Sequence, residues 1–252
     1  MGAVLALIAR KGGVGKTTLA ANLAGLYAAE GLRVRLVDLD SQASLSSWCL
    51  GPEAVEAMAP HETVEAVLAG GAAEAVEKPT RWERITLLAS HLKLRPTNPD
   101  PSGLRSRTAE LTILDTPPDL TSPLVRAALL AADFVLSPLD PEAFGAQSVL
   151  SVASALHSVA VAGNPSLRML GYVLNRRERV AIHGVVEDTL RRLHGDMILR
   201  LVLANTAAIK EANLAREPIT TYAPRSKAAA AIRELAEEIM NRIEAAAATK
   251  AA

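Results

Sequence analysis

The sequence is poor in several features that restrict the class of a protein. Its 252 residues include one cysteine, Cys49, which excludes an intramolecular disulfide and a metal site built from several cysteines of one chain. Such cysteine usage fits a reducing compartment, so we expect a cytoplasmic protein. Aromatic residues make up 3% of the chain, which argues against the base-stacking surfaces of single-strand nucleic-acid binders.

Net charge and long apolar runs are also lacking. Lysine plus arginine and aspartate plus glutamate each number 27, so the formal net charge is zero and any binding to nucleic acid or anionic lipid needs a local patch. Every apolar stretch is interrupted well before the ~20 residues that a spanning helix requires. No basic segment precedes the first apolar run, so we expect neither a membrane span nor a secretory signal.

Half of the residues of the chain are apolar, which is enough for one α/β domain with a large core. Short β-branched or leucine-rich runs alternate with helical stretches, which is typical of a mostly parallel, twisted sheet with helices on both faces. We predict a single domain over residues 1–247 and a frayed tail over residues 248–252. The predicted strands are residues 4–9, 34–38, 85–88, 111–114, 134–137, 169–174 and 198–202, and the predicted helices are residues 16–29, 63–70, 123–131, 147–161, 182–193, 207–214 and 227–247.

The most informative segment is residues 11–18, Lys-Gly-Gly-Val-Gly-Lys-Thr-Thr, which lies between a predicted strand and a predicted helix. A strand, a glycine loop and a helix start form the arrangement that cradles nucleotide phosphates. Gly12, Gly13 and Gly15 carry no Cβ, so successive backbone N–H groups can surround an anion at the positive end of the helix.

Two side chains of the segment fit phosphate chemistry directly. Lys16 can reach the β- and γ-phosphates, and the Thr17 hydroxyl can ligate Mg²⁺. Arg10 stands where the strict phosphate-loop pattern has a glycine, and Lys11 adds a second lysine. The loop is therefore a variant of that pattern.

Acidic residues follow two other predicted strands. Asp38 and Asp40 close the strand at residues 34–38 on one side of the extended chain, and Asp115 closes the strand at residues 111–114 before a Thr-Pro-Pro turn. Carboxylates at strand ends serve Mg²⁺ and the attacking water in phosphoryl chemistry. Each acid alone could be an ordinary cap, but the phosphate loop favours a shared site.

Asn175 and Arg176 end the strand at residues 169–174. An asparagine amide can pair with the amino group and a ring nitrogen of adenine together, which would make this the base-binding corner. The alternative is a strand-end turn former. The segment at residues 97–107 holds two prolines, and we expect an exposed loop next to the site.

Together these motifs resemble the deviant Walker-A ATPases of the ParA/MinD superfamily, and most of all the ParA-type partition ATPases. Residues 36–42, 113–118, 218–219 and 222–227 extend the resemblance over nearly the whole chain. It implies a P-loop fold, ATP and Mg²⁺ as cofactors, and slow hydrolysis stimulated by a partner.

The resemblance also assigns roles to single residues. Lys11 matches the signature lysine that touches the partner's phosphates across a homodimer, where a second cation offsets charge on the transferred phosphoryl group. Asp40 matches the acid that positions the attacking water, Asp115 the Walker-B acid, and Asn175 the adenine contact. The predicted catalytic residues are Lys11, Lys16 and Asp40; the predicted nucleotide-binding residues are Gly12, Gly13, Val14, Gly15, Lys16, Thr17, Thr18, Asn175 and Arg176; the predicted metal ligands are Thr17, Asp38 and Asp115.

The function implied by the resemblance is segregation of plasmid or chromosome DNA. An ATP-state homodimer would bind double-stranded DNA non-specifically at the nucleoid, and a ParB-like adaptor protein would stimulate hydrolysis. Residues 203–206 read Leu-Ala-Asn-Thr where many relatives have Ile-Pro-Arg-Asn, and Ser41 replaces a common proline, so DNA binding must use other cations. The candidates, which could instead be solvated residues paired with acids, are Arg191, Arg192, Lys210, Arg216, Arg225, Lys227 and Arg233.

Several alternatives remain beside this hypothesis. A similar ATPase could position a protein cargo, or the chain could transfer phosphate to a small substrate like dethiobiotin synthetase-like enzymes. An electron-transfer ATPase is excluded because it needs two cysteines per subunit. The last predicted helix could anchor in a membrane, as in the MinD branch, but its apolar spacing and the acids on its other face favour packing against the core.

Overall fold

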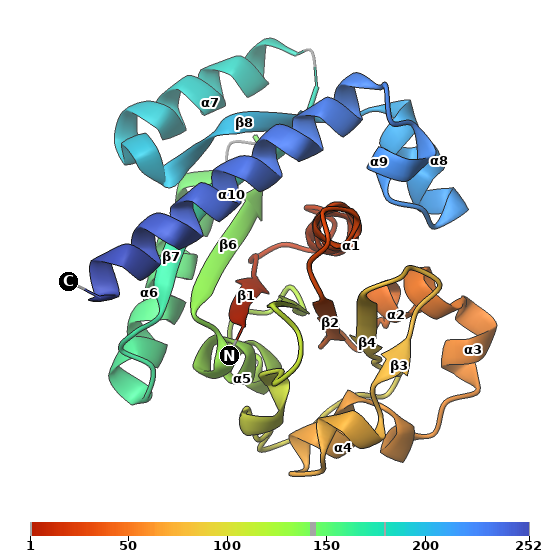
Figure 1. The fold of residues 1–252 in the computed structure, drawn as a ribbon. Helices are drawn as coiled ribbons and strands as arrows, with labels where there is room; N and C mark the ends of the chain where they lie inside the picture. Colours follow the sequence, from red (N-terminus) through yellow and green to blue (C-terminus); the bar gives the residue numbers. More distant parts are fainter. Residues whose placement is uncertain (1, 142–144, 179, 252) are drawn as a thin grey trace.

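The computed structural model describes residues 2–141, 145–178 and 180–251. An eight-stranded sheet with the order β3-β4-β2-β5-β1-β6-β7-β8 runs through the centre of the molecule (Figure 1). Every pair is parallel except β3 and β4. The strands are β1 (Ala3–Leu7), β2 (Val34–Asp38), β3 (Lys78–Pro79), β4 (Ile85–Leu88), β5 (Leu111–Asp115), β6 (Phe134–Leu139), β7 (Arg168–Arg177) and β8 (Ile198–Ala204).

Helices cover both faces of the sheet, as the alternation of strands and helices predicted. The helices are α1 (Lys16–Ala29), α2 (Ser44–Leu50), α3 (Pro52–Glu56), α4 (Val64–Leu68), α5 (Pro123–Ala131), α6 (Gly145–Ala162), α7 (Ala181–His194), α8 (Ala207–Ala215), α9 (Ile219–Tyr222) and α10 (Lys227–Ala251). Along β1, Leu5 and Leu7 belong to the core shared with α1 and α10, whereas Val4 and Ala6 belong to the core shared with α5 and α6. This alternation follows from the two-residue period of a strand.

The seven predicted strands and seven predicted helices are present, and the bounds of α1 and α5 agree with the prediction. The prediction missed α2, α3, α9 and β3, each of seven residues or fewer. Elements this short carry too little of a period to stand out in a sequence.

The last helix packs against the core. Ile232, Leu235, Ile239 and Ile243 are buried, and the Tyr27 hydroxyl of α1 donates to the Ala236 carbonyl at 2.9 Å. The predicted core-facing helix is therefore confirmed. Among the described helices, none has the length and apolar character to cross a bilayer. Helix α10 reaches Ala251; residue 252 of the predicted frayed tail lies outside the described residues, so fraying stays a prediction.

The expectation for residues 97–107 was right about a loop with exposed residues, among them Thr97, Asn98 and Arg107, but wrong about its place next to the site. Leu104 and Ser106 are buried, and Arg105 pairs with Asp133 at 2.8 Å. Asp133 also accepts from the Val4 amide at 3.0 Å, so the segment is fixed at the amino end of β1, opposite the phosphate loop. The prolines indicated a loop, but they gave no sign of the contacts that Arg105 makes with a distant part of the chain.

Strand β8 lies at the edge of the sheet, and side chains form hydrogen bonds with some of its backbone groups that no neighbouring strand pairs. Glu238 of α10 accepts from the Arg200 amide at 3.1 and 3.2 Å, and Arg242 donates to Glu238 at 2.8 Å. Arg191 of α7 donates to the carbonyls of Leu199 and Arg200 at 3.1 and 3.0 Å. Both backbone polar groups of Arg200 are therefore bonded to side chains.

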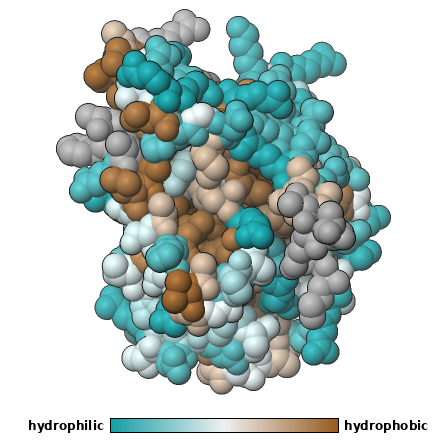
Figure 2. Space-filling view, turned by 90° about the vertical axis from the view of Figure 1, so that its left-hand side faces the viewer, coloured by the Kyte–Doolittle hydropathy of each residue, from teal (hydrophilic) through white to brown (hydrophobic). Residues whose placement is uncertain are grey.

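Helices α6 and α7 also present apolar residues outward. Figure 2 views the molecule from their side and shows brown, apolar surface spread over that face. The exposed apolar residues of the two helices are Leu150, Val161, Ile182, Val185 and Leu193.

Gly25 of α1 lies close to Pro218, the residue that precedes α9, and this packing can be tested. A Cβ added at Gly25 would lie 2.3 Å from Pro218 Cγ, whereas one at Gly184 in α7 would meet nothing within 4 Å. We expect Gly25→Ala to lower the free energy of unfolding by about 1–3 kcal/mol through overpacking. Gly184→Ala, the matched control, should raise it by about 0.5–1 kcal/mol because alanine favours the helix. Urea unfolding measures both, and a stabilising Gly25→Ala would contradict the close packing.

Candidate functional site

The segment between β1 and α1 forms a loop that only glycine can close without strain. Gly13 and Gly15 have φ values of 75° and 93°, in the left-handed region. The loop leads into the 14-residue helix α1, whose first N–H groups have no partner within the helix. The chain thus places backbone donors and the positive end of a helix dipole around one point, the geometry of a phosphate site.

A cavity of about 460 Å³ opens at this loop. The predicted residues Gly12, Lys16, Thr17 and Asp40 line it together with Trp48, which the sequence did not indicate. Lys16 is 7% exposed. Burial lowers the pKa of Lys16, and the nearby carboxylates of Asp115 and Asp40 oppose this shift by favouring the charged ammonium.

Strand register brings the acids to the same edge. Asp38 on β2 is paired with Asp115 on β5, and Asp115 is paired with Leu7, the last residue of β1 before the loop. Burial and, to a smaller extent, the neighbouring Asp38 carboxylate raise the pKa of Asp115 to about 7, although the bond from Thr17 acts in the opposite direction. A cation bound here would offset this cost by favouring the charged carboxylate.

The residues at Asp115 fit a magnesium ion. The Thr17 hydroxyl donates to Asp115 Oδ2 at 2.6 Å, whereas the buried Oδ1 atom of Asp115 has no hydrogen-bond partner among the described residues. A buried carboxylate oxygen without a donor suits a metal ion or a metal-bound water. The described residues contain no cluster of three or more histidine, cysteine and acidic ligands.

Asp38 lies in a different environment from Asp115. Its Oδ1 accepts from the Asp40 amide at 3.1 Å, and its Oδ2 accepts from the amide and the hydroxyl of Ser46 at 2.8 and 2.7 Å. Burial raises the pKa of Asp38 to about 6, against the effect of these bonds. Both oxygens are thus bonded to protein donors, so the role of Asp38 as a direct metal ligand stays a prediction that the geometry favours less than Thr17 and Asp115.

The strand end of β7 holds the phosphate loop. Asn175 donates through Nδ2 to the Val14 carbonyl at 2.8 Å, and its Oδ1 accepts from the Arg176 amide at 2.8 Å. Arg176, whose φ is 58°, donates to the Gly13 carbonyl at 2.7 Å. The Asn175 amide is therefore bonded to the loop, and its predicted contact with adenine stays a prediction.

A second cavity of about 270 Å³ adjoins this corner and shares Gly13, Gly15, Thr18 and Asn213 with the first. Asn213 of α8 donates to the Thr18 hydroxyl at 3.2 Å. The segment at residues 203–205 lines this second cavity, so the departure from the usual family sequence lies where a base beside the phosphate loop would fit.

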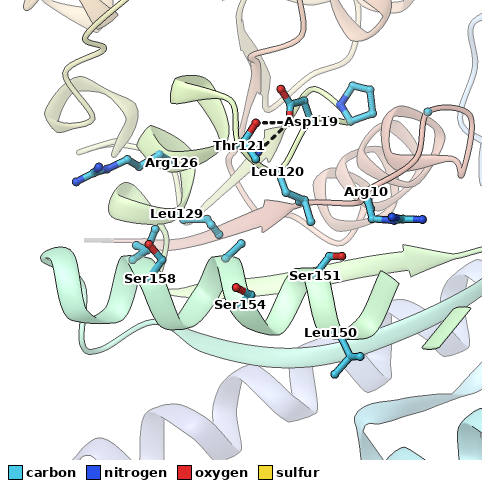
Figure 3. Close-up of a pocket in the computed structure, with 14 residues that line it drawn as sticks. Arg10, Asp119, Leu120, Thr121, Arg126, Leu129, Leu150, Ser151, Ser154 and Ser158 are labelled. Carbon is cyan, nitrogen blue, oxygen red and sulfur yellow. Dashed lines mark hydrogen bonds between the residues drawn. The ribbon is translucent and has the colours of Figure 1, made fainter. Parts of the chain in front are cut away.

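A larger groove of about 1010 Å³ lies on the other side of the loop, between α5 and α6. Figure 3 shows Arg10 and Arg126 toward opposite ends of the groove, with Leu120 and Leu129 between them and Ser154 on α6 facing the same space. Gly12 and Pro118 line this groove and the cavity at the loop alike. Anything bound in the groove would therefore lie beside the phosphate loop.

The basic candidates fall into two separate regions. Arg191 is turned inward onto β8 and Glu187, so its guanidinium is committed within the fold. Arg192 is exposed at the carboxyl end of α7, near the start of β8, whereas Lys210 is exposed on α8, beyond the end of β8 (Figure 1). Three exposed cations, Arg225, Lys227 and Arg233, follow α8 and α9 in the chain, and Arg216 ends α8 with a left-handed φ of 55°.

Sequence reasoning missed several residues of the site. Ser46 lies on the short helix α2, and Asn213 and Trp48 show their proximity only in three dimensions. Ser90, whose hydroxyl donates to the Asp40 carbonyl at 2.8 Å, could have been found, because it follows β4 at the edge of the sheet where Asp115 ends β5 and Asp40 follows β2.

The two tryptophans of the chain stack on each other. The rings of Trp48 and Trp82 lie 4.4 Å apart between centroids at an angle of 16°, and the Arg81 guanidinium lies 4.5 Å from the Trp82 centroid. Arg81 also donates to the Arg216 carbonyl at the end of α8. Trp48 thus lines the cavity, and Trp82 stacks on Trp48. Both residues are fluorescent probes of the site.

Comparisons with known proteins agree with this geometry. A family model described as the CobQ/CobB/MinD/ParA nucleotide binding domain matches residues 5–219. The chromosome-partitioning ATPase Soj of Thermus thermophilus is 34% identical over 256 residues, covering 95% of this chain and 96% of the relative.

Two solved structures share the fold. The septum site-determining protein MinD of Pyrococcus horikoshii, in complex with Mg-ADP, has a TM-score of 0.75 at 26% identity, covering 95% of this chain and 96% of that one. Cyanthece apo McdA has a TM-score of 0.81 at 17% identity, covering 96% of this chain and all of that one, a likeness of fold alone.

The position of Trp48 predicts an optical response to nucleotide. With Trp82→Phe, Trp48 is the sole tryptophan, and we expect its emission to change on addition of ATP and Mg²⁺ because phosphates enter the cavity that it lines. The matched variant Trp48→Phe, which leaves Trp82, should respond less. Fluorescence titration measures both, and an unchanged Trp48 emission at saturating ATP would contradict nucleotide binding in this cavity.

Proposed function

Because the chain belongs to the CobQ/CobB/MinD/ParA family of nucleotide-binding domains, as a ParA-type ATPase, we propose that its ATP-bound homodimer binds double-stranded DNA non-specifically. In this proposal it partitions plasmid or chromosome DNA together with a ParB-like adaptor protein, which stimulates slow, Mg²⁺-dependent ATP hydrolysis. The observation that carries the proposal is the phosphate loop with Thr17 bonded to Asp115 at 2.6 Å and with Lys11 on the same loop.

In this proposal the residues of the site have different roles in hydrolysis. Thr17 and Asp115 would hold Mg²⁺, which when bound neutralises charge on the β- and γ-phosphate oxygens. The loop amides and Lys16 bind the phosphates and keep the γ-phosphate in place. Asp40 lines the same cavity and orients the attacking water, so most of the catalysis is positioning and electrostatic stabilisation.

Lys11 is the reason for proposing a dimer. A second lysine on the loop gives a second cation for charge that develops on the transferred phosphoryl group. We assign it to the phosphates of the partner subunit, so that two nucleotides are enclosed between two chains. An enzyme acting on a small substrate would gain nothing from this residue.

The exposed cations around α8 and the start of α10 are the proposed DNA surface. Lys210, Arg225, Lys227 and Arg233 belong to this region, and a two-fold axis would double the patch. Contacts of this kind reach phosphates rather than base edges, so the binding would not depend on DNA sequence. Arg192 lies at the other end of β8 and is assigned no contact.

The role of Asp40 is tested by Asp40→Ala. We expect turnover to fall by about 10²-fold or more, since the attacking water loses its partner, while ATP binding and ATP-dependent dimerisation remain. Phosphate release and light scattering measure the two effects. Asp188→Ala, an exposed aspartate on α7, should leave both unchanged. Lys11→Ala should also stop turnover, and monomeric Asp40→Ala protein in the presence of ATP would contradict the proposal.

The DNA surface is tested with random-sequence duplex DNA in ATP, in ADP and without nucleotide, across a salt series. We expect binding in ATP alone, weakening steeply with salt, since about six phosphate contacts give a slope of about −5 in the logarithmic plot. The triple variant Arg225→Ala, Lys227→Ala, Arg233→Ala should lower both affinity and slope, whereas Arg192→Ala should not. Intact ATP turnover without DNA binding would point instead to a protein cargo or a small substrate.

A further inference from the structure

A closed ring of hydrogen bonds connects Asp40 to residues that neither the motifs nor the nucleotide chemistry requires. The Ser90 hydroxyl donates to the Asp40 carbonyl at 2.8 Å, and the Ser90 amide donates to the Ser46 hydroxyl at 2.8 Å. The Ser46 hydroxyl donates in turn to Asp38 Oδ2 at 2.7 Å. Asp38 Oδ1 accepts from the Asp40 amide at 3.1 Å, which closes the ring.

Three of the four residues of the ring are fully buried, and Asp40 is half-buried at the cavity. Asp38, Ser46 and Ser90 are each 0% exposed. Asp38 ends β2, Ser46 lies on α2, and Ser90 follows β4, the parallel neighbour of β2. Because buried hydrogen bonds are not exchanged for bonds to water, each member is costly to remove, and the ring has a defined geometry.

The ring holds the backbone of Asp40 on both sides of its Cα atom. Its amide is bonded to Asp38 and its carbonyl to Ser90, while its carboxylate is left at the cavity, where Oδ1 accepts from the Gln42 amide at 3.0 Å. A side chain that must orient a water needs such a fixed backbone, since an error of about 1 Å in placement can cost 10²-fold in rate.

We propose that Ser46 and Ser90 are positioning residues for ATP hydrolysis, which act by fixing the Asp40 backbone through this buried ring. The inference rests on the proposed function, because it assumes that Asp40 orients the attacking water. Neither serine lines the cavity at the phosphate loop. Ser90 acts on Asp40 directly, and Ser46 acts through Asp38 and the Ser90 amide.

The first test is Ser90→Ala. The substitution removes the donor to the Asp40 carbonyl, and we expect kcat to fall by about 10- to 100-fold, while KM for ATP changes less than about twofold because the phosphate loop is untouched. Ser46→Ala should give a similar loss of kcat. The matched control is Ser137→Ala on β6, since Ser137 is also 0% exposed but its hydroxyl has no hydrogen-bond partner among the described residues.

A double-mutant cycle separates positioning from a general loss of structure. Under single-turnover conditions, Ser90→Ala added to Asp40→Ala should lower the residual rate less than about twofold, since the residue that it positions is already gone. A further loss as large as that in the wild-type background would overturn the inference. Thermal unfolding of each variant shows the folded fraction, and if Ser90→Ala does not fold, Ser46→Ala completes the same cycle.

The outcomes distinguish this inference from the function on which it rests. If Asp40→Ala hydrolyses ATP at the wild-type rate, the proposed role of Asp40 is wrong. If Asp40→Ala loses turnover while folded Ser90→Ala and Ser46→Ala keep the kcat of Ser137→Ala, the positioning role alone is wrong.

Discussion

The parallel register of β1, β5 and β2 is the constraint on which the whole site depends. Leu7, Asp115 and Asp38 are paired across the three strands, so the segments that leave these strands emerge at one edge of the sheet. The phosphate loop, Asp115 and the Asp40 turn meet there although they lie far apart in the chain. A shift of one residue in any of the pairings would turn a carboxylate to the opposite face.

The charged groups at this edge of the sheet suit a ligand that has both anionic and cationic parts. Two carboxylates and one ammonium are buried, and burial disfavours the charged form of each, as the raised pKa of Asp115 and the lowered pKa of Lys16 show. Phosphates favour the charged lysine, and a divalent cation favours the charged aspartate. Nucleotide with its metal would therefore offset the cost of burying these charges.

Local patterns were enough to predict the loop, the strand ends and the sheet, because each depends on residue types at short spacing. The bond from Thr17 to Asp115 spans 98 positions, yet the motifs had assigned both residues to one predicted metal site. Contacts with no local signal escaped prediction. Arg191 looked like a surface cation but is bonded to the backbone of β8, Asn175 is bonded to the loop, and Arg105 anchors a proline-rich segment far from the site. In each case a partner outside the residue's own pattern, 8 positions away for Arg191 and 161 for Asn175, decides where the side chain points.

The contacts of Arg200 in β8 bear on how copies of this protein can assemble. A strand at the border of a sheet offers unpaired amides and carbonyls, which invite the strand of another molecule. Here Glu238 and Arg191 already occupy both polar groups of Arg200, and each is itself paired with a charged neighbour. An incoming strand would have to displace these ion pairs, so the middle of β8 is protected against edge-to-edge pairing with another copy.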